Sequence, residues 1–320
     1  MFQNITILII AIFCCASINA NTLNDIEEYL KLPSKEIDPI HGLLLVNKII
    51  LPNTDITYYR NRISEIVEEI TAIYGSPRLD HIINYLFNEM EENNYSVLRY
   101  PPDYVADNKP SSIAGKHHTL SHIIETKEGV CDARAFLLFA VCNEADIPAM
   151  IGYAPYHPFV MFPAKEKGKL IHLETGANAY MVDREYFLKR WGLVGYSNKS
   201  LFLAPLLNKE VVLTALSSAV ENFVEKGDME KAIYLNDLVL KYKPYDFMGL
   251  QNKIYILTKR LEKEYNKGYP DNEYMNHLLE RIDRLNAVIS NNNLYDKDYE
   301  KFMEVSKKYD EEINPYIPRS

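Results

Sequence analysis

Three residues in the middle of the chain have the types and the order of a nucleophile, a base and an orienting acid: Cys131, His157 and Glu174. A cysteine thiolate attacks carbonyl carbon atoms, and a histidine can take the thiol proton and later give it to a leaving amine. A carboxylate beside the histidine holds the imidazole in one tautomer and stabilises its charged form. Together these residues could transfer the acyl group of a peptide or another amide.

The first element that must position them is a predicted helix from Cys131 to Ala145. It contains no breaker, is apolar nearly all round and ends before Pro148, which is the pattern of a buried helix. Cys131 opens this helix directly after the turn at Gly129. Because unpaired N–H groups at a helix start favour negative charge, we expect a lowered thiol pKa. The amide of Cys131 is also one candidate donor to an oxyanion.

The other two residues lie on predicted strands. The strands are Ala149 to Tyr153, His157 to Phe162 and Leu170 to Glu174. A charged, glycine-bearing segment at 165–169 predicts a hairpin turn between the last two. With the turn centred near 165–167, counting along the antiparallel strands places His157 directly opposite Glu174 or one diagonal step away.

Taken singly, each of the three residues has a structural explanation. A lone cysteine in an apolar helix is usually a core residue. A histidine at a strand start is usually structural or on the surface, and an acid beside a turn is usually solvated. Their order on a helix start and two paired strands favours chemistry. Pro158, directly after His157, lacks an N–H, so we expect the strand to be an edge there.

The segments around these residues carry recognisable motifs. They are Gly129-Val130-Cys131 at a helix start, Ile147-Pro148-Ala149 before a strand, the His157 strand and the acidic strand ending in Glu174-Thr175-Gly176. In this order they resemble the transglutaminase-like superfamily. The closer resemblance is to a bacterial branch in which Glu replaces the usual Asp and a tetratricopeptide tail follows. Further matches are Val182-Asp183-Arg184-Glu185-Tyr186, Ala204-Pro205-Leu206 and Lys209-Glu210.

The segment after about Leu206 is predicted to be helical to the end of the chain. Helices are expected at Val211 to Glu225 and Met229 to Tyr242, followed by two or three more. One tetratricopeptide repeat is a helical hairpin of about 34 residues. Its spacing is matched by Phe223, Gly227-Asp228, Ala232 and Pro244.

We therefore expect an α+β fold. The resemblance implies a transglutaminase-like (papain-like) core, in which a buried helix packs on an antiparallel sheet, with a helical N-terminal region and an α-helical tetratricopeptide-like C-terminal domain. The expected units are a signal peptide at 1–20, the helical N-terminal region of the core domain at 21–115, the cysteine core at 116–205 and the tetratricopeptide-like domain at 206–320.

The resemblance implies a cysteine peptidase, amidase or acyltransferase that hydrolyses or transfers acyl groups through Cys131, His157 and Glu174. A peptide or protein is the expected substrate, and no cofactor is expected. The alternative is a catalytically silent transglutaminase-like fold that binds a protein partner through its tetratricopeptide-like tail.

The first twenty residues resemble a secretory signal peptide. An apolar run from Ile5 to Cys15 is broken only by Thr6, and an Ile-Asn-Ala ending follows at Ala20. The run is too short for a membrane-spanning helix, which needs about 20 apolar residues. We expect export to the periplasm or the outside after cleavage near Ala20, with no stable membrane span. A lipid anchor at Cys14 or Cys15 is the alternative.

Cleavage of the leader would leave Cys131 and Cys142 as the cysteines of the mature chain. On one helix their eleven-residue separation corresponds to about 16 Å. A disulfide needs Cα atoms within about 7 Å, so both thiols should be free.

The charge and the histidines exclude other classes of function. A net charge of −9 argues against nucleic-acid binding, which needs a basic surface. His118 and His122 stand four apart on a predicted helix, with His117 adjacent, and such a pair can bind zinc. The Glu of H-E-x-x-H is missing. We therefore favour a solvated helix face and expect no metal.

Overall fold

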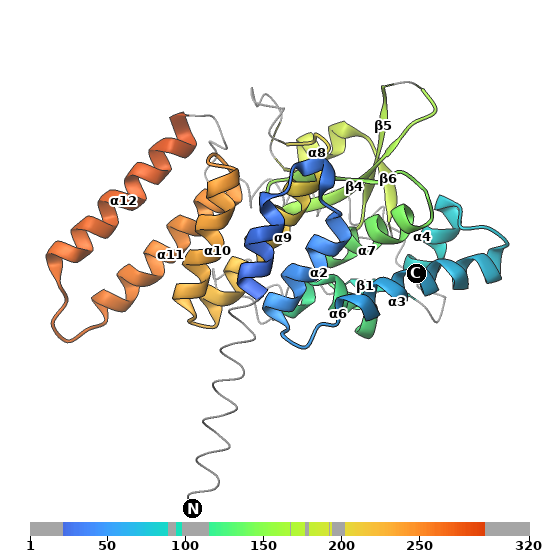
Figure 1. The fold of residues 1–320 in the computed structure, drawn as a ribbon. Coiled ribbons are helices and arrows are strands. Elements are labelled where there is room, and N and C mark those ends of the chain that lie inside the picture. Colours follow the sequence, from blue (N-terminus) through green and yellow to red (C-terminus); the bar gives the residue numbers. More distant parts are fainter. Residues whose placement is uncertain are drawn as a thin grey trace, which may run out of the picture.

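The computed structural model describes residues 22–88, 94–97, 115–166, 168–176, 179–191, 193 and 202–291. In these residues, helices surround a four-stranded antiparallel sheet (Figure 1). The expected α+β class is therefore confirmed. The predicted signal peptide at 1–20 lies outside the described residues.

The N-terminal region is helical because its apolar residues recur at helical spacing and local signals mark its ends. Residues 22–31 form the first helix. The next elements are η1 (Ser34–Glu36), α2 (Pro39–Ile50), α3 (Ile56–Tyr74) and α4 (Leu79–Phe87). Asp38 caps α2 by accepting hydrogen bonds from the amides of Ile40 and His41. Gly75, with φ of 78°, ends α3 in the left-handed conformation that glycine adopts at low cost.

A short segment then leads to the buried central helix α7 (Cys131–Glu144). Its elements are η2 (Gly115–His118), α6 (Leu120–Thr126), and β2 (Glu128–Gly129), which pairs in parallel with β1 (Ser96–Val97). From Asp132 to Cys142 every residue of α7 is buried, which confirms the predicted buried helix. Cys131 and Cys142 are both free thiols, as the spacing predicts.

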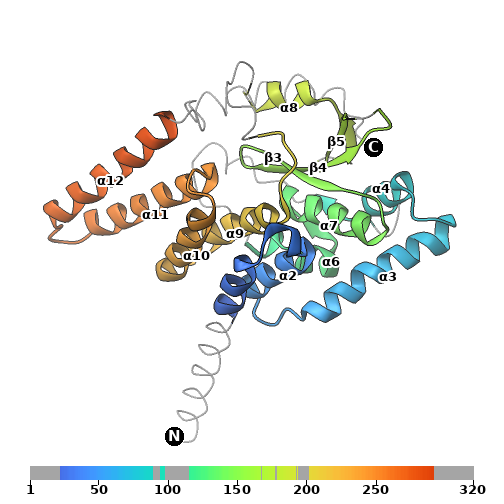
Figure 2. The ribbon, with the colours of Figure 1, turned by 45° about the horizontal axis from the view of Figure 1, so that its top comes forward.

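The sheet consists of four strands in chain order. Their bounds are β3 (Met150–Ala154), β4 (His157–Pro163), β5 (Leu170–Glu174) and β6 (Tyr180–Val182). The helix α8 (Arg184–Arg190) follows β6. Figure 2 shows α7 under one face of the sheet and α8 over the other. Val160 and Phe162 pack in the cluster that contains α7, whereas Phe159 and Met161 pack in the cluster that contains α8. β4 is therefore apolar on both faces.

The hairpin register determines how the two predicted site residues of the sheet meet. Val160 pairs with Leu173, so the same register places Glu174 opposite Phe159, one diagonal step from His157. This confirms the position that counting predicts. Pairing with β5 begins at Val160, whereas Pro158 pairs only with Tyr153 of β3. The expectation of an edge at Pro158 is therefore confirmed.

The tail consists of helical hairpins. Its helices are α9 (Asn208–Glu225), α10 (Met229–Tyr242), α11 (Phe247–Tyr265) and α12 (Asn272–Asn291). The two predicted helices correspond to α9 and α10. α9 packs against both α2 and α10, and the α11–α12 pair extends away from the sheet (Figure 1).

The tail shares its hydrophobic core with the rest of the chain. Val212 and Leu216 of α9 belong to the same buried cluster as Leu137 of α7. The segment 202–206 also lies along β3, where the Leu203 N–H donates to the Tyr153 carbonyl at 2.9 Å and the Leu206 N–H donates to the Ile151 carbonyl at 2.8 Å. The expected domain boundary at 206 stays a prediction, because the core is continuous across it.

In the described ranges, no helix combines the length and the apolar character that a membrane crossing requires.

The burial of α7 predicts a large effect of truncating a side chain there. Leu138 has no exposed surface, so Leu138→Ala should lower the free energy of unfolding by about 3 kcal/mol through lost burial and an unfilled cavity. Urea denaturation measures this. The matched control Ile73→Ala, at a position that is 59% exposed, should change it by less than about 0.5 kcal/mol. Equal effects at the two positions would contradict the packing described for α7.

Candidate active site

His157 and Glu174 form a buried pair at one end of the sheet. The Nε2 atom of His157 lies 2.9 Å from Oε1 and 2.8 Å from Oε2 of Glu174. The two residues are 7% and 3% exposed. The structure thus brings together two of the three predicted site residues. Because Glu174 takes up Nε2, Nδ1 is the ring nitrogen that can accept a proton when the imidazole is neutral.

The turn after β5 is shaped to hold the carboxylate of Glu174. The Gly176 N–H donates to Oε1 of Glu174 at 2.6 Å. A Cβ on residue 176 would lie 3.0 Å from this same oxygen and 3.5 Å from Cε1 of His157. Glycine is therefore the residue that lets the backbone approach both members of the pair.

The contacts with His157 and Gly176 determine the charge state of Glu174. Burial raises the pKa of Glu174, but the charge of His157 and the hydrogen bonds from His157 and Gly176 outweigh it and lower the pKa below its ordinary value. The carboxylate is therefore ionised near neutral pH, and it can hold His157 with the proton on Nε2.

An aromatic layer covers His157. The Trp191 ring stacks on the imidazole with centroids 4.9 Å apart and planes 22° apart, and Phe187 lies further along the same side at 6.4 Å. Stacked rings restrict the rotation of the imidazole and keep water from the His157–Glu174 contact. Sequence reasoning did not find Trp191. It is the one tryptophan of the chain and follows the short helix after the acidic strand, which was the available signal.

Cys131 occupies the first position of α7, as predicted, and α7 packs against β4. Its thiol donates a hydrogen bond to Oδ1 of Asp132 at 3.2 Å. Across the described residues no hydrogen bond joins Cys131 to His157. The structure therefore places the cysteine on the expected element but directs its thiol to a neighbour that sequence reasoning overlooked.

The thiol of Cys131 does not have the lowered pKa that a helix start alone predicts. Burial raises its pKa well above the ordinary value, and the carboxylates of Asp132 and Glu174 raise it further. Burial also raises the pKa of Cys142, where it is the one cause of the shift. Adjacent negative charge is the feature that distinguishes Cys131.

Asp132 belongs to a second histidine–carboxylate pair. Its Oδ2 atom lies 3.1 Å from Nδ1 of His118 and accepts a hydrogen bond from the Ser218 hydroxyl at 2.7 Å. Burial raises the pKa of Asp132, but His118 and Ser218 outweigh it and lower the pKa.

The expectation that His118 and His122 share a solvated helix face is wrong. His118 lies in η2, before the helix, and its side chain is 15% exposed against Asp132. His122 lies in α6, and its Nε2 atom is 3.1 Å from Nδ1 of His117. The break between η2 and α6 at Thr119 separates the two side chains. In the part of the chain that the structure describes, no group of three or more His, Cys, Asp or Glu residues could hold a metal ion.

Arg134 connects the helix of Cys131 to the turn after Glu174. Its side chain is 1% exposed. Nε donates to the Thr175 carbonyl at 2.7 Å, NH1 donates to the Tyr95 carbonyl, and the guanidinium lies 4.3 Å from the centre of the Phe87 ring. Because Thr175 lies between Glu174 and Gly176, this bond fixes the turn that holds the carboxylate.

Comparisons of the chain with models of protein families and with curated protein sequences found no match. A family and a function for this chain are therefore proposals from its own residues and geometry.

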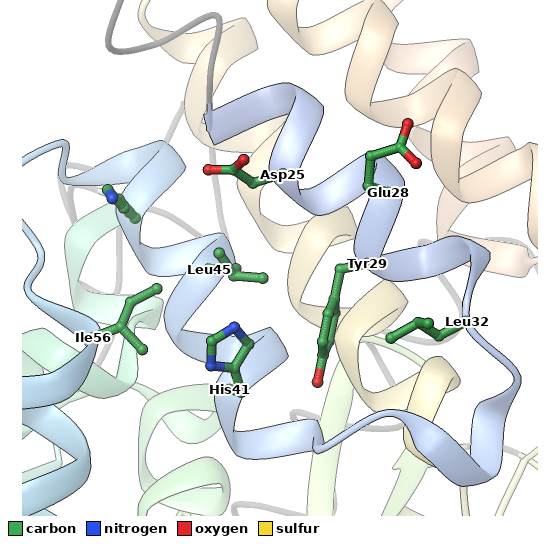
Figure 3. Close-up of a pocket in the computed structure, with 8 residues that line it drawn as sticks. Asp25, Glu28, Tyr29, Leu32, His41, Leu45 and Ile56 are labelled. Carbon is green, nitrogen blue, oxygen red and sulfur yellow. The ribbon is translucent and has the colours of Figure 1, made fainter.

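A hollow of about 450 Å³ lies elsewhere, between the first helix (22–31) and α2 (Figure 3). Asp25, Glu28, Tyr29 and His41 are among its lining residues, and none of the three predicted site residues is. The Tyr29 and His41 rings lie side by side in its lining, with centroids 5.2 Å apart and planes tilted by 49°. Among the described residues, the lining of the hollow contains no cysteine, so the hollow is separate from the predicted cysteine site.

The lowered pKa of Glu174 predicts a stabilising effect that depends on pH. A carboxyl group whose pKa is lower in the folded state stabilises that state above its unfolded pKa of about 4.3, and the effect is lost as the pH falls through the folded value. Glu174→Gln should therefore be destabilised most near pH 6, and the deficit should shrink by roughly 1–2 kcal/mol towards pH 3. Urea denaturation at several pH values measures this. A deficit that stays constant, or that also appears in the exposed control Glu166→Gln, would contradict it.

The hydrogen bonds of Arg134 predict that removing its donors lowers the free energy of unfolding. Arg134→Met leaves two buried carbonyl groups without this donor, so the free energy of unfolding should fall by about 3 kcal/mol. The exposed control Arg284→Met, which loses only a surface pair with Glu280, should lose less than about 0.5 kcal/mol. Thermal or urea unfolding distinguishes the two, and a neutral Arg134→Met would show that the turn is held by other contacts.

Proposed function

We propose that the chain is a transglutaminase-like cysteine enzyme that hydrolyses or transfers the acyl groups of peptides and other amides. Cys131 is the nucleophile, His157 the base and then the acid, and Glu174 the orienting acid. The observation that carries the proposal is the contact of Glu174 with Nε2 of His157 at 2.8 Å, because it leaves Nδ1 for the thiol proton.

The reaction follows from these roles. Nδ1 of His157 takes the thiol proton as the sulfur of Cys131 bonds to the carbonyl carbon of the substrate. The protonated His157 then gives its proton to the amine nitrogen as the C–N bond breaks, which leaves a thioester on Cys131. Water gives hydrolysis and a second amine gives transfer. Either one loses a proton to His157 as it attacks the thioester carbon, and His157 returns that proton to the sulfur of Cys131 as the C–S bond breaks. In this proposal, backbone amides at the start of α7 stabilise the oxyanion.

Export after cleavage near Ala20, a peptide or protein substrate and a tetratricopeptide-like tail complete the proposal. They derive from the sequence pattern. The alternative, a silent fold that binds a protein partner through its tail, stays a prediction.

An activated ester tests the proposed nucleophile and base. With p-nitrophenyl acetate, the protein should acquire an acetyl group on Cys131 and then turn over, and Cys142 should stay unmodified because it is buried. His157→Gln can still donate to Glu174 but cannot shuttle the proton, so the acylation rate should fall roughly 100-fold. Release of p-nitrophenolate gives the rate, and peptide mass mapping gives the site.

The control is His277→Ala, at an exposed position of α12, which should acylate at the rate of the unmodified protein. Circular dichroism confirms that each variant is folded. If Cys131 is not acylated, or if His157→Gln reacts as fast as the control, the protein is not a Cys–His enzyme.

A further inference from the structure

Two kinds of group have opposite effects on the thiol of a cysteine enzyme. A histidine base favours a thiolate, because the resulting imidazolium is positive. An ionised carboxylate disfavours a thiolate, because the two negative charges repel. The described contacts join the thiol to the carboxylate of Asp132, at 3.2 Å, and not to His157. The thiol proton, which the reaction must transfer to His157, is therefore held in a hydrogen bond to Asp132.

The side-chain conformation of Asp132 is fixed by its surroundings. Its side chain is 10% exposed, and both neighbours of its Oδ2 atom come from other elements, His118 from η2 and Ser218 from α9. Oδ1 is thereby aimed at the sulfur.

We propose that Asp132, fixed by His118 and Ser218, is a positioning residue that keeps the Cys131 thiol protonated and bonded away from His157, so that the nucleophile is released only when this contact is broken. The inference rests on the proposed function, since it concerns the activation of the same nucleophile. Ser218 belongs to the tail, so the tail contributes directly to the resting state of the site.

The charges around Asp132 determine the sign of each substitution. The groups that interact with Asp132 or the thiol from the packed elements are His118 of η2, Tyr153 of β3, Glu174 of β5 and Glu221 of α9. Behind them, Glu225 of α9 acts on His118 and Glu221, and Asp246 before α11 acts on Tyr153. His118 is the cation of this set. Burial lowers the pKa of His118, but the bond to Asp132 and the nearby carboxylates outweigh it and raise the pKa. Burial together with Asp132 and Glu225 raises the pKa of Glu221 to about 7.

Removing the charge of Asp132 should therefore activate the thiol, and removing the charge of His118 should suppress it. Asp132→Asn keeps the shape of the side chain without its charge. His118→Gln can still donate to Asp132 but leaves the carboxylate uncompensated. A general loosening of the structure would instead accelerate modification in both variants, so the opposite signs separate a positioning role from a structural one.

The experiment is alkylation of the folded full-length protein by iodoacetamide between pH 5.5 and 10, with rates mapped to Cys131 by mass spectrometry. Asp132→Asn should move the midpoint to lower pH and raise the rate at pH 7 at least about tenfold, the effect of removing one adjacent like charge. His118→Gln should move the midpoint upward. The exposed control Glu166→Gln should leave it unchanged.

Unchanged or slower alkylation in Asp132→Asn overturns the inference, as does faster alkylation in both variants. If Asp132→Asn does not fold, an upward shift in His118→Gln supports the inference and its absence overturns it. His157→Gln in the same series separates the two proposals. If the alkylation of Cys131 changes in His157→Gln but not in Asp132→Asn, only the inference is overturned. If it changes in Asp132→Asn but not in His157→Gln, the proposed function is overturned.

Discussion

A buried carboxylate is the constraint on which the site depends. Glu174 is 3% exposed, and an ionised carboxylate removed from water is tolerated only where donors surround it. His157 and Gly176 supply those donors, and each requires support of its own. Gly176 can approach because it has no Cβ, the turn is bound to α7 through Arg134, and the imidazole is held flat under Trp191. The orientation of one histidine thus depends on contacts from β4, β5, α7 and the end of α8.

Two histidine–carboxylate pairs belong to the predicted site and differ in which partner the carboxylate contacts, although both carboxylates raise the pKa of the Cys131 thiol. In the His157–Glu174 pair the carboxylate faces the far nitrogen of the ring, so its charge supports a base. In the His118–Asp132 pair the carboxylate bonds the thiol itself, so its charge opposes the thiolate. The helix start at Cys131 favours negative charge, and the backbone of Asp132 lowers the pKa of the thiol, but burial and the carboxylates of Asp132 and Glu174 outweigh it. The reactivity of the thiol therefore depends on the balance of these charges more than on the helix alone.

The sequence predicted the structure correctly where residues close together in the chain determine it. The buried helix from Cys131, the strand ending at Glu174 and the diagonal placement of His157 all follow from periodicity and from counting through one hairpin. The other parts depend on contacts that no local pattern encodes. Ser218 meets Asp132 across 86 residues, and η2 separates His118 from His122 at Thr119. A helix-start argument for the thiol pKa failed because it ignored the burial of the thiol and the carboxylate at the next position.

Because the tail shares a hydrophobic core with the rest of the chain, an enzymatic role and a partner-binding role would not belong to separate domains. A tail that served only to bind a partner could be joined to the core by a linker. Instead α9 packs on α2 in the same hydrophobic cluster as α7, and the segment before it lies along β3. Ser218 of α9 reaches Asp132 at 2.7 Å. A force that shifted α9 would act on the cysteine through this one hydrogen bond, because Asp132 bonds α9 and the thiol with its two oxygens. The tail and the segment that carries Cys131 are therefore parts of one packed unit.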